Sequence, residues 1–197
     1  QQVLVSLSGV VVNSIVNSFG ATVIAGFGAG SRLDQFAFMP SMSMGLAVSA
    51  LVGQNLGAGK TERVSETVKW GAILASSITV LVSAIAILRP RILMVLFTQD
   101  EAVLVEGSRY LRYMAFSYIP MSLMFTIGGV IRGAGDTVAT MYLTLGSLWI
   151  VRVPLARYLS SLPELGVAGV WLAMLMGTCM GLVFHFLEAE SHRAKIA

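Results

Sequence analysis

Polar side chains at helical spacing mark one face of the first long apolar stretch. Ser6, Gly9, Asn13 and Asn17 follow one another at intervals of three or four residues, which places them on one side of a helix. Amides in an apolar stretch either face a water-filled cavity or hydrogen-bond across a packed helix interface. Two amides and two small residues on one stripe favour the cavity. We therefore predict that Asn13 and Asn17 line a substrate cavity.

A second group of candidate cavity residues lies close to prolines. Met44 follows Pro40 by four residues, and Tyr118 and Met121 flank Pro120. Methionine is flexible and polarizable, so it adapts to ligands of different shape, although it also serves as lipid-facing filler. We predict that these three side chains share the cavity with the asparagines. Because a proline inside a helix removes a backbone hydrogen bond, we also predict helix bends at three positions: Pro40, Pro120 and Pro154.

One cation stands inside an apolar stretch. Arg152 is costly to keep charged in hydrocarbon, so it needs an acceptor. The acid on the same expected membrane side is Asp34, about one turn into its own span. We expect Arg152 to be compensated by Asp34 or by carbonyl oxygens at span ends. His185 has no metal-ligand spacing and no catalytic partner, and we expect neither an enzyme nor a bound cofactor or metal.

The amino-acid composition indicates whether the helices that carry these residues face water or lipid. The chain is 56% apolar and 12% charged, with a mean hydropathy of +0.80. Soluble domains are about one quarter charged, so the partner of this surface is a lipid bilayer. A scattered net charge of +3 gives no nucleic-acid footprint. We predict an all-α membrane protein.

Apolar runs of about twenty residues, the length that crosses a bilayer core, predict six transmembrane helices. The predicted spans are residues 3–24, 36–57, 68–88, 113–131, 137–159 and 167–187. Gly26, Gly28 and Gly30 are interpreted as a loop between the first two spans. Residues 92–112 are too charged to span, and they predict an interfacial amphipathic helix or the wet first turns of the next span. The glycines before Lys60 are interpreted as a helix C-terminus.

Several motifs in fixed order resemble the multidrug and toxic compound extrusion (MATE) transporters. The resemblance covers nearly the whole chain. It rests on Ser31-Arg-Leu-Asp-Gln35, on the stretch from Pro40 to Arg63 with Gly-Gln-Asn-Leu-Gly-Ala-Gly-Lys, on Phe97-Thr98 followed by Asp100-Glu101, on Arg132-Gly-Ala-Gly-Asp-Thr137 and on Leu148-Trp-Ile-Val-Arg-Val-Pro154.

The resemblance implies that six spans form one lobe of a twelve-helix transporter whose N-terminal lobe is missing here. It implies export of small organic, often cationic, compounds, coupled to H⁺ or Na⁺, by alternating access. It also implies a multi-pass protein of the inner (plasma) membrane with a cytoplasmic C-terminus, an orientation that loop Lys and Arg residues do not decide. Some members carry a coupling carboxylate where Met121 stands here, so we expect the coupling acid in the other lobe.

Two alternatives stay open at this point. A related flippase lobe for a lipid-linked or polysaccharide precursor would present a basic cavity to phosphates, whereas these spans contain one Arg and no Lys. A membrane fragment that does not transport is the other alternative. A matching first lobe encoded upstream would favour the exporter.

Overall fold

The computed structural model describes the backbone of residues 2–196 and the side chains of residues 3–191. Within this range every regular element is helical. The elements are α1 (Gln2–Asn17), α2 (Ala21–Gly57), α3 (Thr61–Leu88), α4 (Pro90–Met94), α5 (Glu101–Gly133), α6 (Thr137–Leu145), the π-helical segment η1 (Gly146–Arg152), α7 (Val153–Ser160) and α8 (Val167–Ile196).

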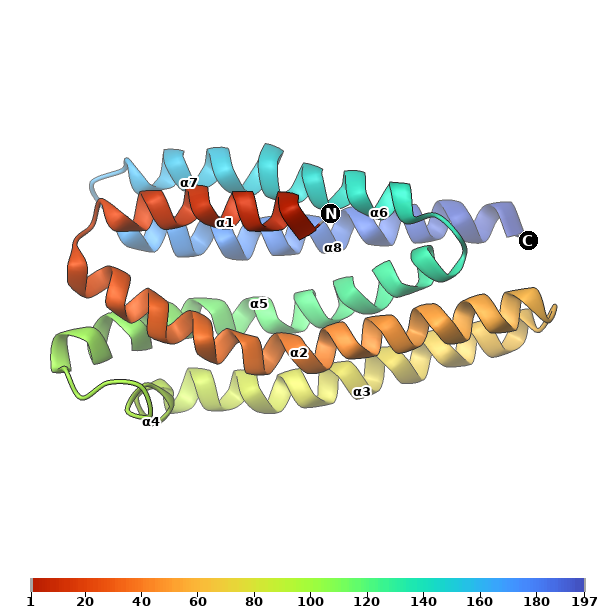
Figure 1. Cartoon of the computed structure of the whole chain (residues 1–197), viewed down its shortest axis with the longest axis horizontal. Coiled ribbons are helices and arrows are strands. Elements are labelled where there is room, and N and C mark those ends of the chain that lie inside the picture. The colour runs from red at the N-terminus through yellow and green to blue at the C-terminus, as the bar shows by residue number, and fades with distance from the viewer. Residues whose placement is uncertain (1, 197) are drawn as a thin grey trace.

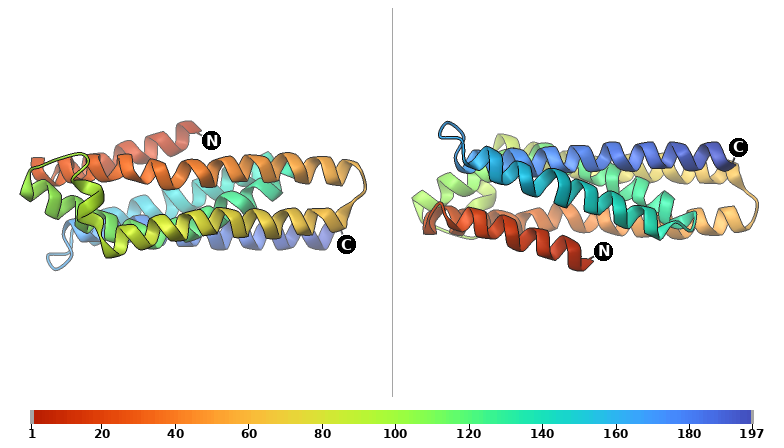
Figure 2. Two further views of the ribbon diagram at one scale, coloured as in Figure 1. Left: turned by 90° about the horizontal axis from the view of Figure 1, so that it is seen from below. Right: turned by 90° about the horizontal axis from the view of Figure 1, so that it is seen from above.

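The helices lie along one long axis in two layers (Figure 1). One layer holds α2, α3 and α5, with the short α4 at one end, and the other holds α1, α8 and the run α6–η1–α7. Helix α5 packs against α2 and α3 in its own layer and against α8 in the other. Figure 2 shows the same elongated bundle from two further sides. Helix α5 therefore joins the layers.

Five of these helices are long and apolar enough to cross a membrane. They are Ala21–Gly57, Thr61–Leu88, Glu101–Gly133, Thr137–Ser160 and Val167–Ser191, and the shorter Val3–Asn17 is also apolar. Large apolar side chains such as Leu81 and Ile150 are exposed on the outside of the bundle. These five long apolar helices and the shorter one confirm the predicted all-α membrane fold.

The predicted boundary between the first two spans is wrong. Helix α1 ends at Asn17, Gly20 makes the turn with φ 102°, and α2 then runs unbroken through Gly26, Gly28 and Gly30. Gly26 is a packing residue, because a β-carbon there would lie 2.8 Å from the backbone nitrogen of Gly107 on α5. Small residues at this spacing allow two helix backbones to approach closely.

The predicted interfacial helix over residues 92–112 is also wrong. Helix α4 occupies only Pro90–Met94, and α5 starts at Glu101 and continues through the predicted fourth span. The side chain of Asp100 caps α5 by accepting from the backbone N–H groups of Ala102 and Val103 at 2.9 and 3.3 Å. The charged segment therefore forms the first turns of a long helix, as the alternative interpretation had it.

The glycines at the end of α2 do form a helix C-terminus. Gly59 has φ 68°, its N–H donates to the carbonyl of Leu56 at 3.0 Å, and the N–H of Lys60 donates to Asn55 at 2.8 Å. These two bonds define a Schellman cap, which satisfies carbonyls that the helix leaves free. The interpretation of these glycines as a helix C-terminus is confirmed.

Two of the three prolines at predicted bends lie inside continuous α-helices, and the third follows a π-helical segment. Pro40 and Pro120 lie inside α2 and α5, which remain continuous and are both bent in Figure 1. Pro154 follows η1 directly, at the start of α7. Such π-helical turns within an α-helical run occur frequently at functional sites.

Candidate functional site

A buried carboxylate lies where α2 packs against α5. Asp34 of α2 is 3% exposed and accepts two hydrogen bonds from phenol hydroxyls of α5. The hydroxyl of Tyr118 donates to Asp34 Oδ1 at 2.6 Å, and the hydroxyl of Tyr110 donates to Oδ2. Both carboxylate oxygens are therefore engaged by one neighbouring helix.

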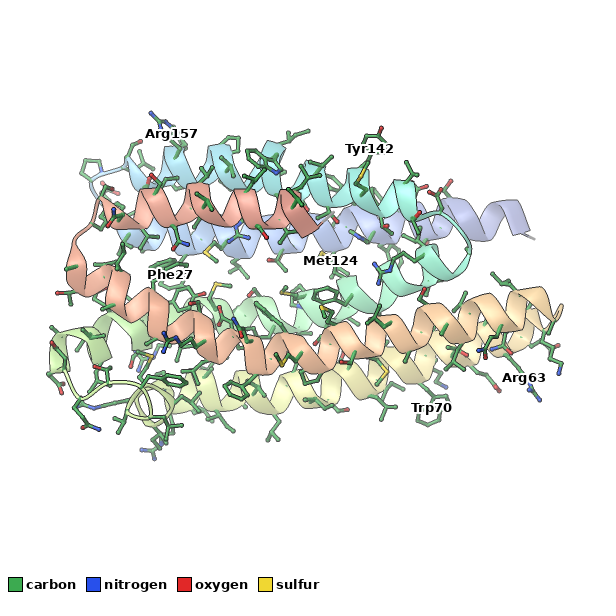
Figure 3. All side chains as sticks on the ribbon, viewed as in Figure 1. Phe27, Arg63, Trp70, Met124, Tyr142 and Arg157 are labelled. Carbon is green, nitrogen blue, oxygen red and sulfur yellow. The ribbon has the colours of Figure 1, made fainter. Side chains whose placement is uncertain are left out.

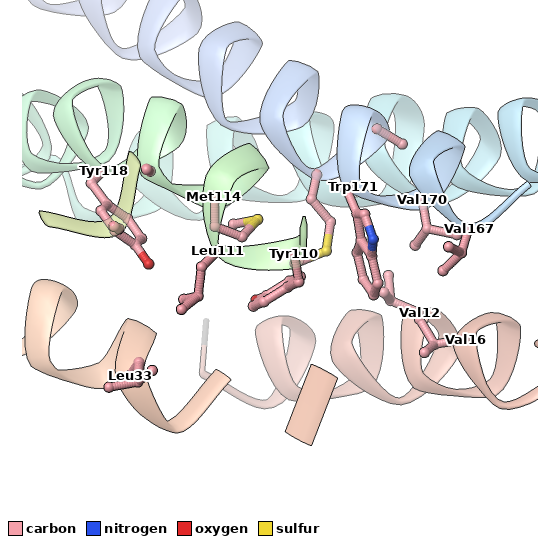
Figure 4. Packing of buried hydrophobic residues seen from close by; sticks show 14 of the residues in the cluster. Val12, Val16, Leu33, Tyr110, Leu111, Met114, Tyr118, Val167, Val170 and Trp171 are labelled. Carbon is pink, nitrogen blue, oxygen red and sulfur yellow. The ribbon is translucent and has the colours of Figure 1, made fainter. Parts of the chain in front are cut away.

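The sequence around Asp34 makes this approach possible. Gly30 lies one turn earlier on α2, and a β-carbon there would collide with the ring of Tyr110. The ring of Tyr110 also meets the indole of Trp171 on α8, with centroids 4.7 Å apart (Figure 4). Phe27 stacks on the same indole at 5.3 Å. The carboxylate thus has an aromatic wall that links α2, α5 and α8.

Arg152 lies next to this cluster without touching Asp34. Its side chain crosses α8 at Gly177, where a β-carbon would lie 2.8 Å from the β-carbon of Arg152. The guanidinium acts electrostatically on Asp34 and Tyr110. The predicted direct ion pair is not observed, because no nitrogen of Arg152 lies within 4 Å of a carboxylate oxygen of Asp34. Spans two and five nevertheless bring their charges to one place.

Two donors around the cluster have no acceptor among the described residues. They are the buried Nε of Arg152 and the buried Nε1 of Trp171. A buried donor without a partner costs about 1–3 kcal/mol, more for a charged group, so each requires an explanation. Carbonyl oxygens at span ends do not supply the predicted compensation for Arg152 Nε. The interior has more donors than the acceptors around them satisfy.

The five residues predicted to share one cavity are not brought together. Asn13 and Asn17 are exposed on α1, while Val12 and Val16 turn inward to the core. Met44 borders a groove between α2 and α3, near Arg63 and Trp70. Arg63 and Trp70 lie in the N-terminal part of α3, whereas Phe27 and Met124 lie between the layers (Figure 3).

Tyr118 and Met121 take different places on α5. Tyr118 is 1% exposed and borders an apolar hollow with Leu33 and Phe36 of α2, in addition to binding Asp34. Met121 is partly buried and borders neither that hollow nor the groove at Met44. A shared substrate cavity stays a prediction, and in this arrangement it would require surfaces outside the described chain.

Tyr110 is the functional residue that the sequence analysis missed. It lies eight residues before Tyr118, slightly more than two helical turns, so the two hydroxyls share one face of a continuous helix. Assigning residues 92–112 to a separate interfacial helix removed that relation. The Asp100 cap before an uninterrupted run is the signal that would have shown it.

We predict that Tyr118→Phe lowers the free energy of unfolding by about 1.5 kcal/mol, because the carboxylate loses one donor. Hydrogen bonds between membrane helices average about 0.6 kcal/mol and reach about 1.7, and a charged acceptor favours the upper end. Tyr142→Phe is the matched control, since Tyr142 is 64% exposed on α6. Reversible unfolding in mixed micelles measures both. Equal values for the two variants would contradict the structural role of the bond.

The arrangement defines a class of protein. Long apolar helices with a carboxylate buried among them are typical of multi-pass membrane proteins, in which such acids mark paths for ions or substrates. The MatE family model matches residues 1–159. The chain belongs to the MatE family.

Curated relatives agree with this assignment. The chain is 30% identical over 187 residues to the probable multidrug resistance protein YpnP of Bacillus subtilis (strain 168), covering 93% of this chain and 42% of that protein. It is 30% identical over 156 residues to the probable multidrug resistance protein NorM of Thermotoga maritima, covering 79% of this chain and 34% of that one. The chain therefore spans less than half the length of these relatives.

Solved structures share the fold at low identity. An outward-facing conformation of a multidrug resistance MATE family transporter superposes with a TM-score of 0.90 at 19% identity, over 98% of this chain and 44% of that one. An inward-facing conformation of a transporter of the same description gives 0.88, also at 19% identity, over 98% and 45%.

Proposed function

We propose that this chain forms one six-helix lobe of a multidrug efflux transporter that works by cation-coupled antiport. The observation that carries the proposal is that the same six helices superpose on an outward-facing and an inward-facing transporter almost equally well, with TM-scores of 0.90 and 0.88. A body that keeps its shape in both conformations suits alternating access, in which two lobes rock against each other around a midplane site.

The relatives support the class of substrate. Two of them are described as probable multidrug resistance proteins, and this chain covers 42% and 34% of their lengths. We infer small organic, often cationic, substrates and a second lobe that completes the transport path. The plasma membrane, with the C-terminus in the cytoplasm, is the location that suits drug export. The flippase alternative would present a basic cavity, whereas the cation between these layers, Arg152, acts on the acidic Asp34.

We expect drug export only when both lobes are present. In cells that lack their own drug pumps, accumulation of a fluorescent organic cation should fall when this chain is expressed with a matching first lobe. The first lobe alone is the control, and a protonophore or removal of sodium shows whether an ion gradient drives the export. Unchanged accumulation with both lobes inserted in the membrane would contradict the proposed function.

A further inference from the structure

Asp34 lies deeper in the bundle than its sequence position suggested. It follows the start of α2 by thirteen residues, about 20 Å at 1.5 Å per residue, and α2 continues for twenty-three residues beyond it. Its 3% exposure keeps it away from water on the sides that the described chain covers. The expectation that Asp34 lies near a span end is therefore wrong. The lobe holds an internal acid of its own.

The charge of Asp34 has few neighbours. The groups that act on it are Tyr110 and Tyr118 of α5 and Arg152 of η1. Described residues 3–17 of α1 include no charged residue. The charged residues of α3 stand in its first turns, and none of them is among the groups that act on Asp34. On α4, Arg91 pairs with Glu101 at 2.6 Å. On α5, Glu106 packs against Gly26 of α2 and has a buried carboxylate oxygen without a partner among the described residues. Asp34 is the acid on which Arg152 acts.

Two hydrogen-bond donors near Asp34 lack an acceptor in the described part of the chain. Asp34 directs both oxygens to the tyrosines, while Arg152 Nε and Trp171 Nε1 have no acceptor among the described residues. Tyr110 is the common neighbour, since its ring meets the indole and the guanidinium acts on it. The carboxylate of Asp34 thus accepts hydrogen bonds from two tyrosines. It acts on the charge of Arg152 without direct contact.

We propose that Asp34 binds and releases the proton that couples this lobe to the ion gradient, and that Arg152 responds to the charge of Asp34. The inference rests on the proposed function and deepens it, because it assigns the coupling step to a residue of this chain. In the deprotonated state the carboxylate accepts from Tyr110 and Tyr118 and balances Arg152. Protonation places one hydrogen on a carboxylate oxygen and removes that balance.

A proton suits the site better than a sodium ion. Hard cations bind in proteins through several oxygen ligands, and the two oxygens of Asp34 already accept from phenols. No group of three or more His, Cys, Asp or Glu side chains within the described part of the chain could hold a metal ion.

The backbone around Arg152 is a segment that can change conformation when the charge of Asp34 changes. Arg152 is partly buried and its Nε is shielded without an acceptor among the described residues, so protonation of Asp34 removes the negative charge that acts on it and drives its guanidinium toward water or another acceptor. Arg152 ends the π-helical segment η1, and Pro154 follows with no N–H to donate. We expect the amides of residues 146–153 to open when Asp34 is protonated.

The experiment uses the purified chain in lipid nanodiscs over a range of pH. Infrared difference spectra should show the C=O stretch of a protonated carboxyl group appearing as the pH falls, and Asp34→Asn should abolish this band. Hydrogen exchange of residues 146–153 should rise over the same pH range, and in Asp34→Asn it should be high at every pH. Glu101→Gln, which removes an exposed acid, should retain both responses.

Tyr118→Phe provides a second variant if Asp34→Asn does not fold. It should keep the pH-dependent band but shift its frequency, because the carboxyl group loses a hydrogen-bond partner. A band that survives in Asp34→Asn, or exchange in residues 146–153 that ignores pH, would overturn the inference. A response to sodium at constant pH would overturn the proton assignment. None of these measurements requires transport. If Asp34 titrates but the two lobes together export no drug, then the proposed function is refuted and the protonation site at Asp34 is retained.

Discussion

Replacement of Asp34 by alanine should lower the free energy of unfolding by about 2–6 kcal/mol, because two buried phenol donors lose their acceptor at a cost of about 1–3 kcal/mol each. The variant leaves the hydroxyls of Tyr110 and Tyr118 without their acceptor and removes the negative charge that acts on Arg152. The loss should exceed that of Tyr118→Phe, which removes one hydrogen bond and no charge. Reversible unfolding in mixed micelles gives both values on one scale.

A second substitution separates charge from packing. If the cost arises from an uncompensated cation, then Arg152→Met should restore part of the stability lost in Asp34→Ala, because the double variant no longer buries a lone charge. The single variant Arg152→Met should also be destabilised, since Asp34 then lacks its counter-charge. A double variant that is less stable than Asp34→Ala by the full cost of Arg152→Met would show that the two residues act independently.

The contact between α2 and α5 should be the most sensitive to an added methyl group. A β-carbon on Gly45 would lie 2.6 Å from the carbonyl oxygen of Phe125, and the facing Gly129 would collide with the carbonyl of Gly45. Backbone atoms cannot give way as a flexible side chain can, so the helices must separate. We expect Gly45→Ala to destabilise the protein by about 1–3 kcal/mol, the usual cost of overpacking.

Gly28 provides the control on the same helix. A β-carbon there meets nothing within 4 Å, so Gly28→Ala should gain helix propensity, up to about 1 kcal/mol, at no steric cost. The two glycine variants of α2 should therefore change thermal stability in opposite directions. If both destabilise equally, then helix propensity and flexibility, and not the close contact with α5, govern these positions.

The two ends of α2 differed in how well the sequence predicted them. The exit of α2 was visible in the sequence, since Gly59 caps it before a charged segment. Its entry was not, because Gly26, Gly28 and Gly30 read equally well as a loop or as a packing face. The buried positions continue at intervals of three or four residues across that predicted loop: Gly26, Gly30, Leu33, Asp34, Ala37, Ser41 and Gly45. This continuous period is the pattern of one helix.

The sequence predicted the charged residues of the site, Asp34 and Arg152, but not the tyrosines that bind Asp34. Asp34 and Arg152 were identified because charges in apolar stretches are costly, and each has an electrostatic influence on the other without forming an ion pair. Their partners are tyrosines, whose hydroxyls carry no such signal in an apolar run. Asn13 and Asn17 share a helix face as predicted, but local spacing cannot say whether that face turns to the core, and Val12 and Val16 occupy the core instead.

The most direct test of the account is ion-driven efflux of a fluorescent organic cation from proteoliposomes, measured with this chain alone and with a co-purified matching first lobe. The account predicts efflux with both lobes under an imposed ion gradient and none with either lobe alone, because alternating access requires two bodies. Efflux by this chain alone, or no efflux by the reconstituted pair, would contradict it.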